Sequence, residues 1–487
     1  MGADSKGNVL GSRNAFFIGG QWVKPASDRR FTLVNASTEE LIGTVPEAIE
    51  ADVDRAVAAA RQALENSAWT TMTAAERAQV MVRFAEALGR RAEDVARAVS
   101  AQNGMPLSVS QMFEGQFPPG LLQYYAQLVQ ALPVEEQRPS QMGRETLVSR
   151  GPVGVVAAIV PWNFPVALAM AKIAPALAAG CTLVIKPSPG TVFDSYILGE
   201  AAAEARVPPG VLNWVAADRV VGAYLVSHPG VDKVAFTGST AAGRSIAKVC
   251  GELLRPVTLE LGGKSAAIIL DDADLEQVAQ GLQNASLFNN GQACYNCTRV
   301  LAPAGRYAEV VEALSAMAKG LKVGDALDPT TVVGPMASAA HRERVEGYIA
   351  KGRQEARLVT GGGRPRQLDR GWFVEPTIFA DVDNSATIAQ QEIFGPVLAI
   401  IPYRDEAHAI RIANDSAYGL GGSVWSRDGE RALAVARRVQ TGTIGINGYV
   451  PAIGSPFGGV KASGMGREFG PEALGSYQQW KSVYVMG

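Results

Sequence analysis

The sequence predicts an α/β fold in which mostly parallel sheets are covered by helices on both faces. Strand-like and helix-like segments alternate from residue 153 onward, and the strand-like segments are apolar at nearly every position. The chain has 487 residues, which is enough for two or three domains, each with its own core. We therefore expect a doubly wound sheet followed by a second α/β domain.

The first elements flank this sheet. Residues 50–64 show the apolar spacing of a helix, and Thr73-x-x-Glu76 is a capping box that opens one long amphipathic helix toward Ala101. Residues 153–185 are almost entirely apolar, with Lys172 as their single charge, which is also typical of a membrane span. Three prolines in this stretch argue against one spanning helix, and we predict a βαβ unit instead: Pro161, Pro165 and Pro175.

The alternation then continues in two blocks. In the βαβ unit we predict a strand over 153–160, a helix over 166–179 ended by Gly180, and a strand over 181–185. The rest of the first sheet is predicted as helix 193–206, strand 210–216, helix 220–227, strand 232–236, helix 241–250 and strand 256–261. A second α/β domain is predicted from strand 266–270, helix 275–288, strand 300–302 and helix 307–319.

The composition excludes several classes of function. Lys and Arg number 45 against 47 Asp and Glu, for a net charge of −2, so we predict neither a nucleic-acid nor a membrane partner. Residues 1–13 are polar and do not resemble a signal peptide, and four cysteines cannot staple a chain of this size. We therefore expect a reducing, cytoplasmic setting.

Two loops differ in composition. Residues 361–371 are rich in Gly and Pro and are expected to form an exposed loop, whereas residues 451–466 mix aromatic, basic and glycine residues and are expected to contribute to a site.

Cys294 is a candidate nucleophile. It follows a predicted helix in the small, polar run Asn289-Asn-Gly-Gln-Ala-Cys294, where a substrate can reach a thiol. The alternative is a cysteine packed as a small apolar residue. Cys294 and Cys297 also form a Cys-x-x-Cys pair, but a zinc site would need two further ligands, and the other cysteines and the three histidines are scattered, so no metal is predicted.

Glu260 is a candidate general base. It ends an apolar strand and precedes Gly262-Gly263-Lys264, which places a carboxylate at the carboxyl end of a strand. Partial burial would raise its pKa into the range useful for catalysis. The alternative is a salt bridge to Lys264.

A nucleotide site is indicated by Phe236-Thr-Gly-Ser-Thr-x-x-Gly243. The run lies at a predicted strand-to-helix junction, where free amides and the helix dipole can hold a phosphate. It matches neither Gly-x-Gly-x-x-Gly nor a Walker loop, and such glycines are also common for structural reasons alone.

Together these segments resemble the aldehyde dehydrogenase superfamily, of the hydrolytic, non-CoA-acylating kind, over about residues 16–485. Six blocks in the family's order carry the resemblance: Pro161-Trp-Asn-Phe-Pro165, Phe236-Thr-Gly-Ser-Thr-x-x-Gly243, Leu259-Glu-Leu-Gly-Gly-Lys264, Gly291-Gln-x-Cys294, Glu392-Ile-Phe-Gly-Pro-Val397 and Ser455-Pro-Phe-Gly-Gly459. The resemblance implies that Cys294 is the nucleophile, Glu260 the general base, and Asn163, with the Cys294 backbone N–H, the oxyanion hole. An aldehyde is thereby oxidised through a thiohemiacetal and a thioester.

The resemblance also implies an NAD(P) site. It places Lys186 at the adenine ribose, Gly238 and Ser239 at the pyrophosphate, and Glu392 and Phe394 at the nicotinamide ribose and ring. Further residues of the implied site are Pro161, Trp162, Gly222 and Leu261. The sequence departs from the family's usual pattern in two places. The acid that the family usually carries three residues after this lysine is missing from Lys186-Pro-Ser-Pro189, and Ala-Ala-Asp218 stands where many relatives have a glycine-rich loop. We predict NAD, with NADP left open.

The implied substrate tunnel is apolar and partly aromatic. By motif position it is lined by Phe164, Leu168, Tyr295 and Phe457, with Phe117 a weaker candidate; ordinary core packing is the alternative for each. No Arg or Lys is suggested at its mouth, so we predict aliphatic, terpenoid or aromatic aldehydes rather than acidic ones.

The family's organisation predicts a Rossmann-like doubly wound cofactor domain, a second α/β catalytic domain and a small β oligomerisation arm. The predicted ranges are 1–125 with 150–258, then 259–450, and an arm from 126–149 and 467–487. Residues 145–149 and 482–485 are β-rich segments of that arm, which predicts a homodimer or homotetramer. Two other functions are the alternatives: a CoA-acylating semialdehyde dehydrogenase, which Glu260 disfavours, and a non-catalytic nucleotide-binding protein, which Cys294 and Glu260 together disfavour.

Overall fold

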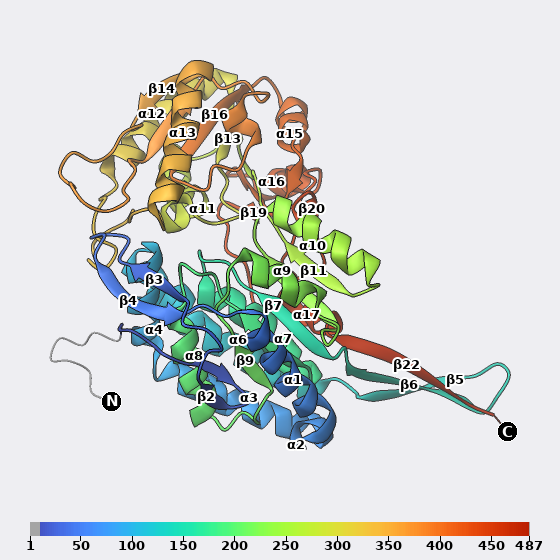
Figure 1. Ribbon diagram of the computed structural model, residues 1–487. Coiled ribbons are helices and arrows are strands. Elements are labelled where there is room, and N and C mark those ends of the chain that lie inside the picture. Colours follow the sequence, from blue (N-terminus) through green and yellow to red (C-terminus); the bar gives the residue numbers. More distant parts are fainter. Residues whose placement is uncertain (1–9, 487) are drawn as a thin grey trace.

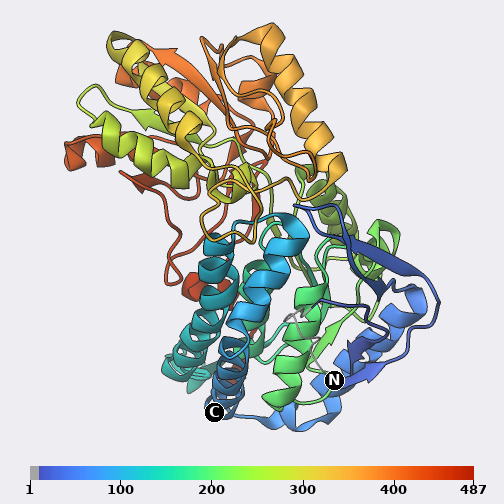
Figure 2. The same ribbon diagram turned by 90° about the vertical axis from the view of Figure 1, so that its left-hand side faces the viewer.

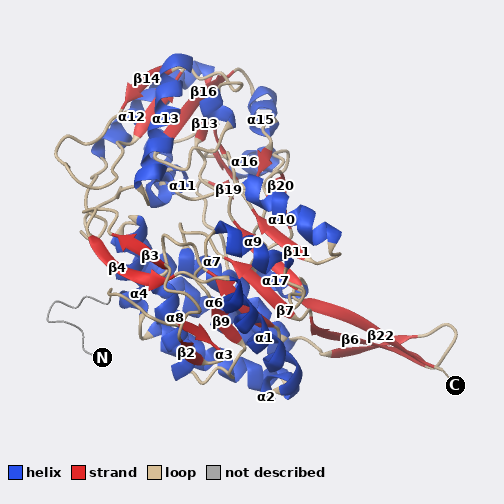
Figure 3. Ribbon diagram, in the orientation of Figure 1, coloured by secondary structure: helices blue, strands red, loops and turns tan. Residues whose placement is uncertain are grey.

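The computed structural model describes residues 10–486, so residues 1–9 and 487 of the predicted ranges lie outside the described residues. Two lobes and a projecting arm are seen in Figure 1, and the two lobes remain separate in the turned view of Figure 2. Figure 3 shows strands inside each lobe with helices around them. The predicted α/β class is confirmed.

An eight-stranded sheet lies in the first lobe, in the order β2-β1-β9-β8-β7-β10-β11-β21. Strands β7 to β11 are parallel, and the other three are antiparallel to their neighbours. The strand order reverses at β7, which makes the crevice between β7 and β10 the expected ligand site of a doubly wound sheet. The strands are β1 Phe16–Ile18, β2 Gln21–Val23, β7 Val155–Ile159, β8 Thr182–Lys186, β9 Leu212–Trp214, β10 Lys233–Thr237, β11 Val257–Glu260 and β21 Gly464–Met465.

Helices cover both faces of this sheet because successive strand residues point to opposite sides. Val155 and Ala157 of β7 pack in one core with α1 (Glu50–Asn66) and α9 (Arg219–Ser227). Val156 and Ala158 pack in another with α3 (Ala74–Gly89) and α7 (Pro165–Ala179). The further helices of this lobe are α2 Ala68–Thr71, α5 Leu107–Ser110, α6 Phe117–Ala131, α7 Pro165–Ala179, α8 Phe193–Glu204, α10 Thr240–Glu252 and the π-helix η1 Gln111–Gln116.

The single long helix predicted to run toward Ala101 is wrong. Two helices occupy this stretch, α3 (Ala74–Gly89) and α4 (Ala92–Asn103). The break follows Gly89, a poor helix former, and Arg91 leaves the helical region at φ −106° and ψ 9°. The capping box is confirmed, since the Thr73 hydroxyl accepts from the Glu76 N–H and the Glu76 carboxylate accepts from the Thr73 N–H.

A seven-stranded sheet forms the second lobe, in the order β14-β15-β16-β13-β12-β18-β19, and all its pairs except β14–β15 are parallel. Its strands are β12 Ala266–Ile269, β13 Arg299–Pro303, β14 Arg357–Thr360, β15 Thr377–Ala380, β16 Val397–Tyr403, β18 Gly422–Trp425 and β19 Gly445–Ile446. Its helices are α11 Leu275–Ser286, α12 Tyr307–Gly320, α13 Ala339–Glu355, α14 Thr387–Gln390, α15 Glu406–Asn414, α16 Gly429–Ala436 and the 3₁₀ turns η2 Phe288–Gly291 and η3 Ala304–Arg306. Residues 361–371 form a loop, as predicted.

The projecting arm is a three-stranded antiparallel sheet of β5 (Glu135–Pro139), β6 (Glu145–Pro152) and β22 (Gln478–Val485). The two β-rich segments predicted outside both large sheets pair here, with Ser482 opposite Val148. The proposed domain boundaries remain predictions; α6 continues to Ala131, past the predicted start of the arm, and β21 belongs to the first sheet. The remaining elements are β3 Arg30–Val34, β4 Leu41–Pro46, β17 Tyr418–Gly419, β20 Val460–Lys461 and α17 Gly470–Gly475.

Within residues 10–486, no helix combines the length and apolar character that crossing a membrane requires.

Candidate active site

A cavity of about 260 Å³ opens where β7, β10 and β11 end, at the reversal of strand order in the first sheet. The chain crosses there to the second sheet through residues 261–265, so elements of both lobes contribute side chains. The sequence-predicted residues that line it are Pro161, Trp162, Asn163, Gly238, Ser239, Glu260, Leu261, Cys294, Glu392 and Phe394. Thr237, Gly262, His341 and Arg344 also line it and were missed from the sequence.

Cys294 lies on a tight loop after α11. Three consecutive residues, Asn289, Asn290 and Gly291, have positive φ values of 50°, 60° and 79°. A Cβ at Gly291 would lie 2.1 Å from the Gly395 carbonyl oxygen, so only glycine allows this approach. Burial, followed by the charges of Glu392 and Glu260, raises the pKa of the Cys294 thiol. The sulfur is therefore protonated at rest and needs a base to become a nucleophile.

Asn163 is held beside this loop by other side-chain amides. The Asn163 side-chain Nδ2 donates to the Gln292 backbone carbonyl at 2.9 Å. The Asn163 backbone carbonyl accepts from Asn289 Nδ2 at 3.0 Å and from Asn103 Nδ2 at 3.2 Å. A side-chain amide carries two N–H groups. One N–H of Asn163 is thus left to donate to a substrate oxygen in the cavity.

Glu260 is 2% exposed, and neither carboxylate oxygen has a hydrogen-bond partner in the described structure. The ion pair with Lys264 considered from the sequence is not formed. Burial, and next the charge of Glu468, raises the pKa of Glu260 well above its usual value. A buried, unpartnered carboxylate that lines a cavity is poised to accept a proton.

Lys172 and Glu468 form a buried ion pair behind Glu260. Lys172 Nζ lies 2.5 Å from Glu468 Oε1 and donates to Thr237 Oγ1 at 2.6 Å. Glu468 raises the pKa of Glu260 and Lys172 lowers it. The sequence does mark Lys172 as unusual, because it is the single charge in the apolar run 153–185. It does not indicate that Glu468 is the partner of this lysine.

A second cavity, of about 440 Å³, continues from the first along α9 and α10. The two share Ser239, the N-cap of α10, and the second is lined by the predicted residues Lys186 and Gly222. A Cβ at Gly222 would lie 2.9 Å from Lys186 Cε, so glycine leaves room for the lysine. Burial lowers the pKa of Lys186 to about 8. Two joined cavities with a helix N-terminus between them fit a dinucleotide with its phosphates at the middle.

The predicted substrate residues lie together in a hydrophobic cluster against which Cys294 packs. Phe117, Tyr295 and Phe457 belong to a closed ring of six aromatic side chains, with Phe164 stacked on Phe288 at 5.8 Å and Leu168 packed against the same cluster. The sequence reasoning missed Phe113, Phe288 and Phe469. Successive centroid distances around the ring are Phe113–Phe288 4.9 Å, Phe288–Tyr295 6.4 Å, Tyr295–Phe457 6.2 Å, Phe457–Phe469 5.9 Å, Phe469–Phe117 5.6 Å and Phe117–Phe113 6.5 Å.

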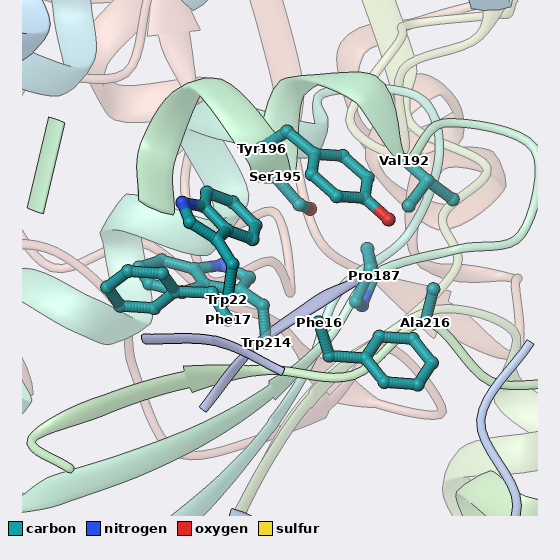
Figure 4. A pocket seen from close by; sticks show the side chains of 9 residues that line it. All are labelled: Phe16, Phe17, Trp22, Pro187, Val192, Ser195, Tyr196, Trp214 and Ala216. Atoms are coloured by element: carbon teal, nitrogen blue, oxygen red, sulfur yellow. The ribbon is translucent and has the colours of Figure 1, made fainter. Parts of the chain in front are cut away.

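Another aromatic pocket lies at the edge of the first sheet (Figure 4). Trp22 stacks on Tyr196 there with centroids 5.4 Å apart, and Phe17 packs edge-on against both Trp22 and Trp214. The space between the rings is about 10 Å³, room for roughly one water molecule. None of the predicted site residues lines it, and it serves as packing between β1 and α8.

Cys297 points away from this site. It is buried in a different core, where it accepts from the Ser423 hydroxyl at 3.6 Å, and all four cysteines are free thiols. In the part of the chain that the structure describes, no three His, Cys, Asp or Glu side chains cluster as metal ligands would.

Comparison with known proteins gives consistent results. Residues 22–483 match the model of the aldehyde dehydrogenase family. A geranial dehydrogenase of Castellaniella defragrans is 63% identical over 97% of this chain and 98% of its own length, and a 3-succinoylsemialdehyde-pyridine dehydrogenase of a Pseudomonas species is 41% identical over 96% and 98%. The crystal structure of a Mycobacterium tuberculosis aldehyde dehydrogenase complexed with NAD+ superposes with a TM-score of 0.96 at 47% identity, covering 98% of this chain and 99% of the other.

Proposed function

The chain belongs to the aldehyde dehydrogenase family, and on that premise we propose that it oxidises apolar aldehydes to free carboxylic acids through a covalent intermediate on Cys294. The observation that carries this proposal is the shared cavity: a reachable thiol, a buried carboxylate without a partner and a fixed amide N–H line the same space. Each of these groups is needed for one step of the reaction.

In the first step, the Cys294 thiol loses its proton to solvent and Sγ adds to the aldehyde carbon. The carbonyl π electrons move to oxygen, where the free Asn163 N–H and the Cys294 backbone N–H stabilise the alkoxide. A bound dinucleotide would supply the acceptor for the hydride that the adduct loses. Cys294 is then left as a thioester of the acid.

In the second step, Glu260 removes a proton from a water molecule, which attacks the thioester carbon. The C–S bond breaks, the acid leaves, and the Cys294 thiolate takes the proton that Glu260 removed from water, which restores both groups. The raised pKa of Glu260 suits this role because the carboxylate can hold and return a proton near neutral pH. Glu260 favours a free acid as the product over an acyl-CoA.

The cofactor is NAD, and we expect it to give higher initial rates than NADP with any accepted aldehyde. Asp218 acts through its charge on Lys186, and this carboxylate should disfavour an added 2′-phosphate. It does not itself line the second cavity, where Lys186 and Arg219 are the charged lining residues. We therefore expect NADP to be used as well, at a lower rate. Absorbance of the reduced nicotinamide, measured with each cofactor and with or without CoA, tests this; a higher rate with NADP contradicts the preference, and a CoA requirement contradicts hydrolysis.

Substrates are expected to be aliphatic, terpenoid or aromatic aldehydes without a charge. The ring of aromatic side chains in the cluster against which Cys294 packs offers apolar contact and contributes no cation to pair with a carboxylate. The relative that is 63% identical carries the name geranial dehydrogenase, which supports a terpenoid substrate.

The substrate class is tested with a matched pair, octanal and the same chain ending in a carboxylate. We expect kcat/KM to be at least about a hundredfold higher for octanal, because the acid must be desolvated against aromatic rings. Steady-state rates with NAD measure this. Equal values for the two aldehydes would show that the ring does not select against charge.

We further propose a homodimer or homotetramer assembled through the arm of β5, β6 and β22. The arm extends from the first lobe (Figure 1). Its β22 side chains Trp480, Val483 and Tyr484 are exposed, and exposed apolar side chains on a β ribbon favour pairing with another copy. The four free thiols support a reducing, cytoplasmic setting.

A further inference from the structure

The segment from Glu392 to Phe394 forms one wall of the cavity that holds Cys294. Phe394 lies in the left-handed region with φ 63°, which is disfavoured for a bulky side chain. A backbone in such a conformation persists only where its neighbours hold it. The Glu392 carboxylate is fixed by the Gly263 N–H at 3.0 Å, but this bond leaves the backbone of the segment free.

The backbone is held instead by the first turns of α13. His341 Nε2 bonds to the Phe394 carbonyl at 2.7 Å, and Arg344 Nη2 donates to the Glu392 carbonyl at 2.7 Å. The two residues are three positions apart, on one face of the helix. A carbonyl only accepts, so the His341 Nε2 carries the proton and donates it.

Packing between aromatic rings also supports the contact between His341 and Phe394. The His341 imidazole packs edge-on against Trp162 at 5.0 Å and against Phe394 at 5.9 Å, and Trp162 packs against Phe394 at 5.3 Å. Burial lowers the pKa of His341 to about 4, so the ring stays neutral at physiological pH and the bond to Phe394 does not change with pH there.

We propose that His341 is a positioning residue, which holds Phe394 in its disfavoured conformation so that the cavity keeps the shape that receives the nicotinamide end of the dinucleotide. This inference rests on the proposed function, because the family resemblance places Phe394 at that ring. His341 acts through Phe394 and takes no part in the steps at Cys294 and Glu260. Its loss should therefore weaken cofactor binding and leave aldehyde binding unchanged.

The test compares His341→Leu, which removes the donor, with His341→Gln, which keeps an N–H donor. His408→Leu is a matched control, since His408 and His341 occupy the same third position after an N-cap, in α15 and α13. We expect His341→Leu to raise the dissociation constant for NAD, measured by calorimetry without aldehyde, about five- to tenfold, and the KM for NAD with it. The KM for aldehyde and the melting temperature should match those of the control, and His341→Gln should bind NAD nearly as the parent does.

Parent-like NAD binding by His341→Leu would overturn the inference, as would a loss in His341→Gln equal to that in His341→Leu. If His341→Leu does not fold, His341→Asn replaces it, because its shorter side chain cannot reach the carbonyl. Failure of the proposed function is distinguishable, since the parent itself would then fail to oxidise aldehydes.

Discussion

Replacing Cys294 by serine should lower kcat/KM for any aldehyde by at least about 10⁴-fold while the protein still folds and binds NAD. A serine hydroxyl is a far weaker nucleophile than a thiolate, and removal of a nucleophile that acts with a base typically costs this much or more. The side chains have similar size, and Cys294 is only partly buried, so little packing is lost.

Cys297→Ser is the matched control. Cys297 is three residues away and buried in a different core, where it accepts from Ser423. We expect its replacement to retain most of the activity. Rates with NAD, together with calorimetric NAD binding, separate loss of chemistry from loss of the site. A Cys294→Ser enzyme within tenfold of the parent would remove Cys294 as the nucleophile.

The resting state of Cys294 gives this test a second readout. Burial and the nearby carboxylates raise the pKa of the thiol, so alkylation by iodoacetamide without cofactor should be slow at neutral pH and should accelerate as pH rises. Mass spectrometry of the labelled peptide would follow it. Rapid labelling at pH 7 would indicate a thiolate at rest and would make a base for the first step unnecessary.

The parts of this site that sequence predicts are those set by local chemistry. Glu260 can be placed at the end of a strand because residues 257–261 are apolar before it and glycine follows, and Ser239 because it stands where strand changes to helix. Both are confirmed by β11 and by the N-cap of α10. Cys294 was expected on a loop after a helix, and it follows α11 and a 3₁₀ turn.

What sequence did not predict depends on contacts between distant segments. Lys172 and Glu468 are 296 residues apart, and nothing in the local pattern of either indicates the other. Phe113 lies in a π-helix whose apolar residues suggest only core packing, yet it meets Phe288 at 4.9 Å. His341 was noted only as a scattered histidine, because its role depends on the backbone of Phe394 from another part of the chain. The broken helix at Gly89 is different, because glycine is a poor helix former and this local signal is present in the sequence.

Replacing Glu260 by glutamine should convert the enzyme to one that oxidises about one equivalent of aldehyde and then stalls. Glutamine keeps the size of the side chain but cannot accept a proton from water, so the thioester on Cys294 should accumulate. We expect a burst of reduced nicotinamide followed by a steady-state rate about 10² to 10⁴-fold lower, and intact-protein mass spectrometry should show the acyl adduct. Glu472→Gln, which changes an exposed acid on α17, should behave as the parent does.

The dependence on pH tests whether Glu260 is the base. Its carboxylate must be deprotonated to activate water, and burial with Glu468 nearby raises its pKa well above 4.5. Thioester hydrolysis in the parent should therefore slow as pH falls through this raised pKa. The same decrease in rate with falling pH should be absent in Glu260→Gln. Hydroxylamine, which attacks thioesters without a base, should restore turnover to the variant. An unchanged pH profile and no adduct would assign the activation of water to another group, and the buried, unpartnered carboxylate of Glu260 would then be left without a role in the reaction.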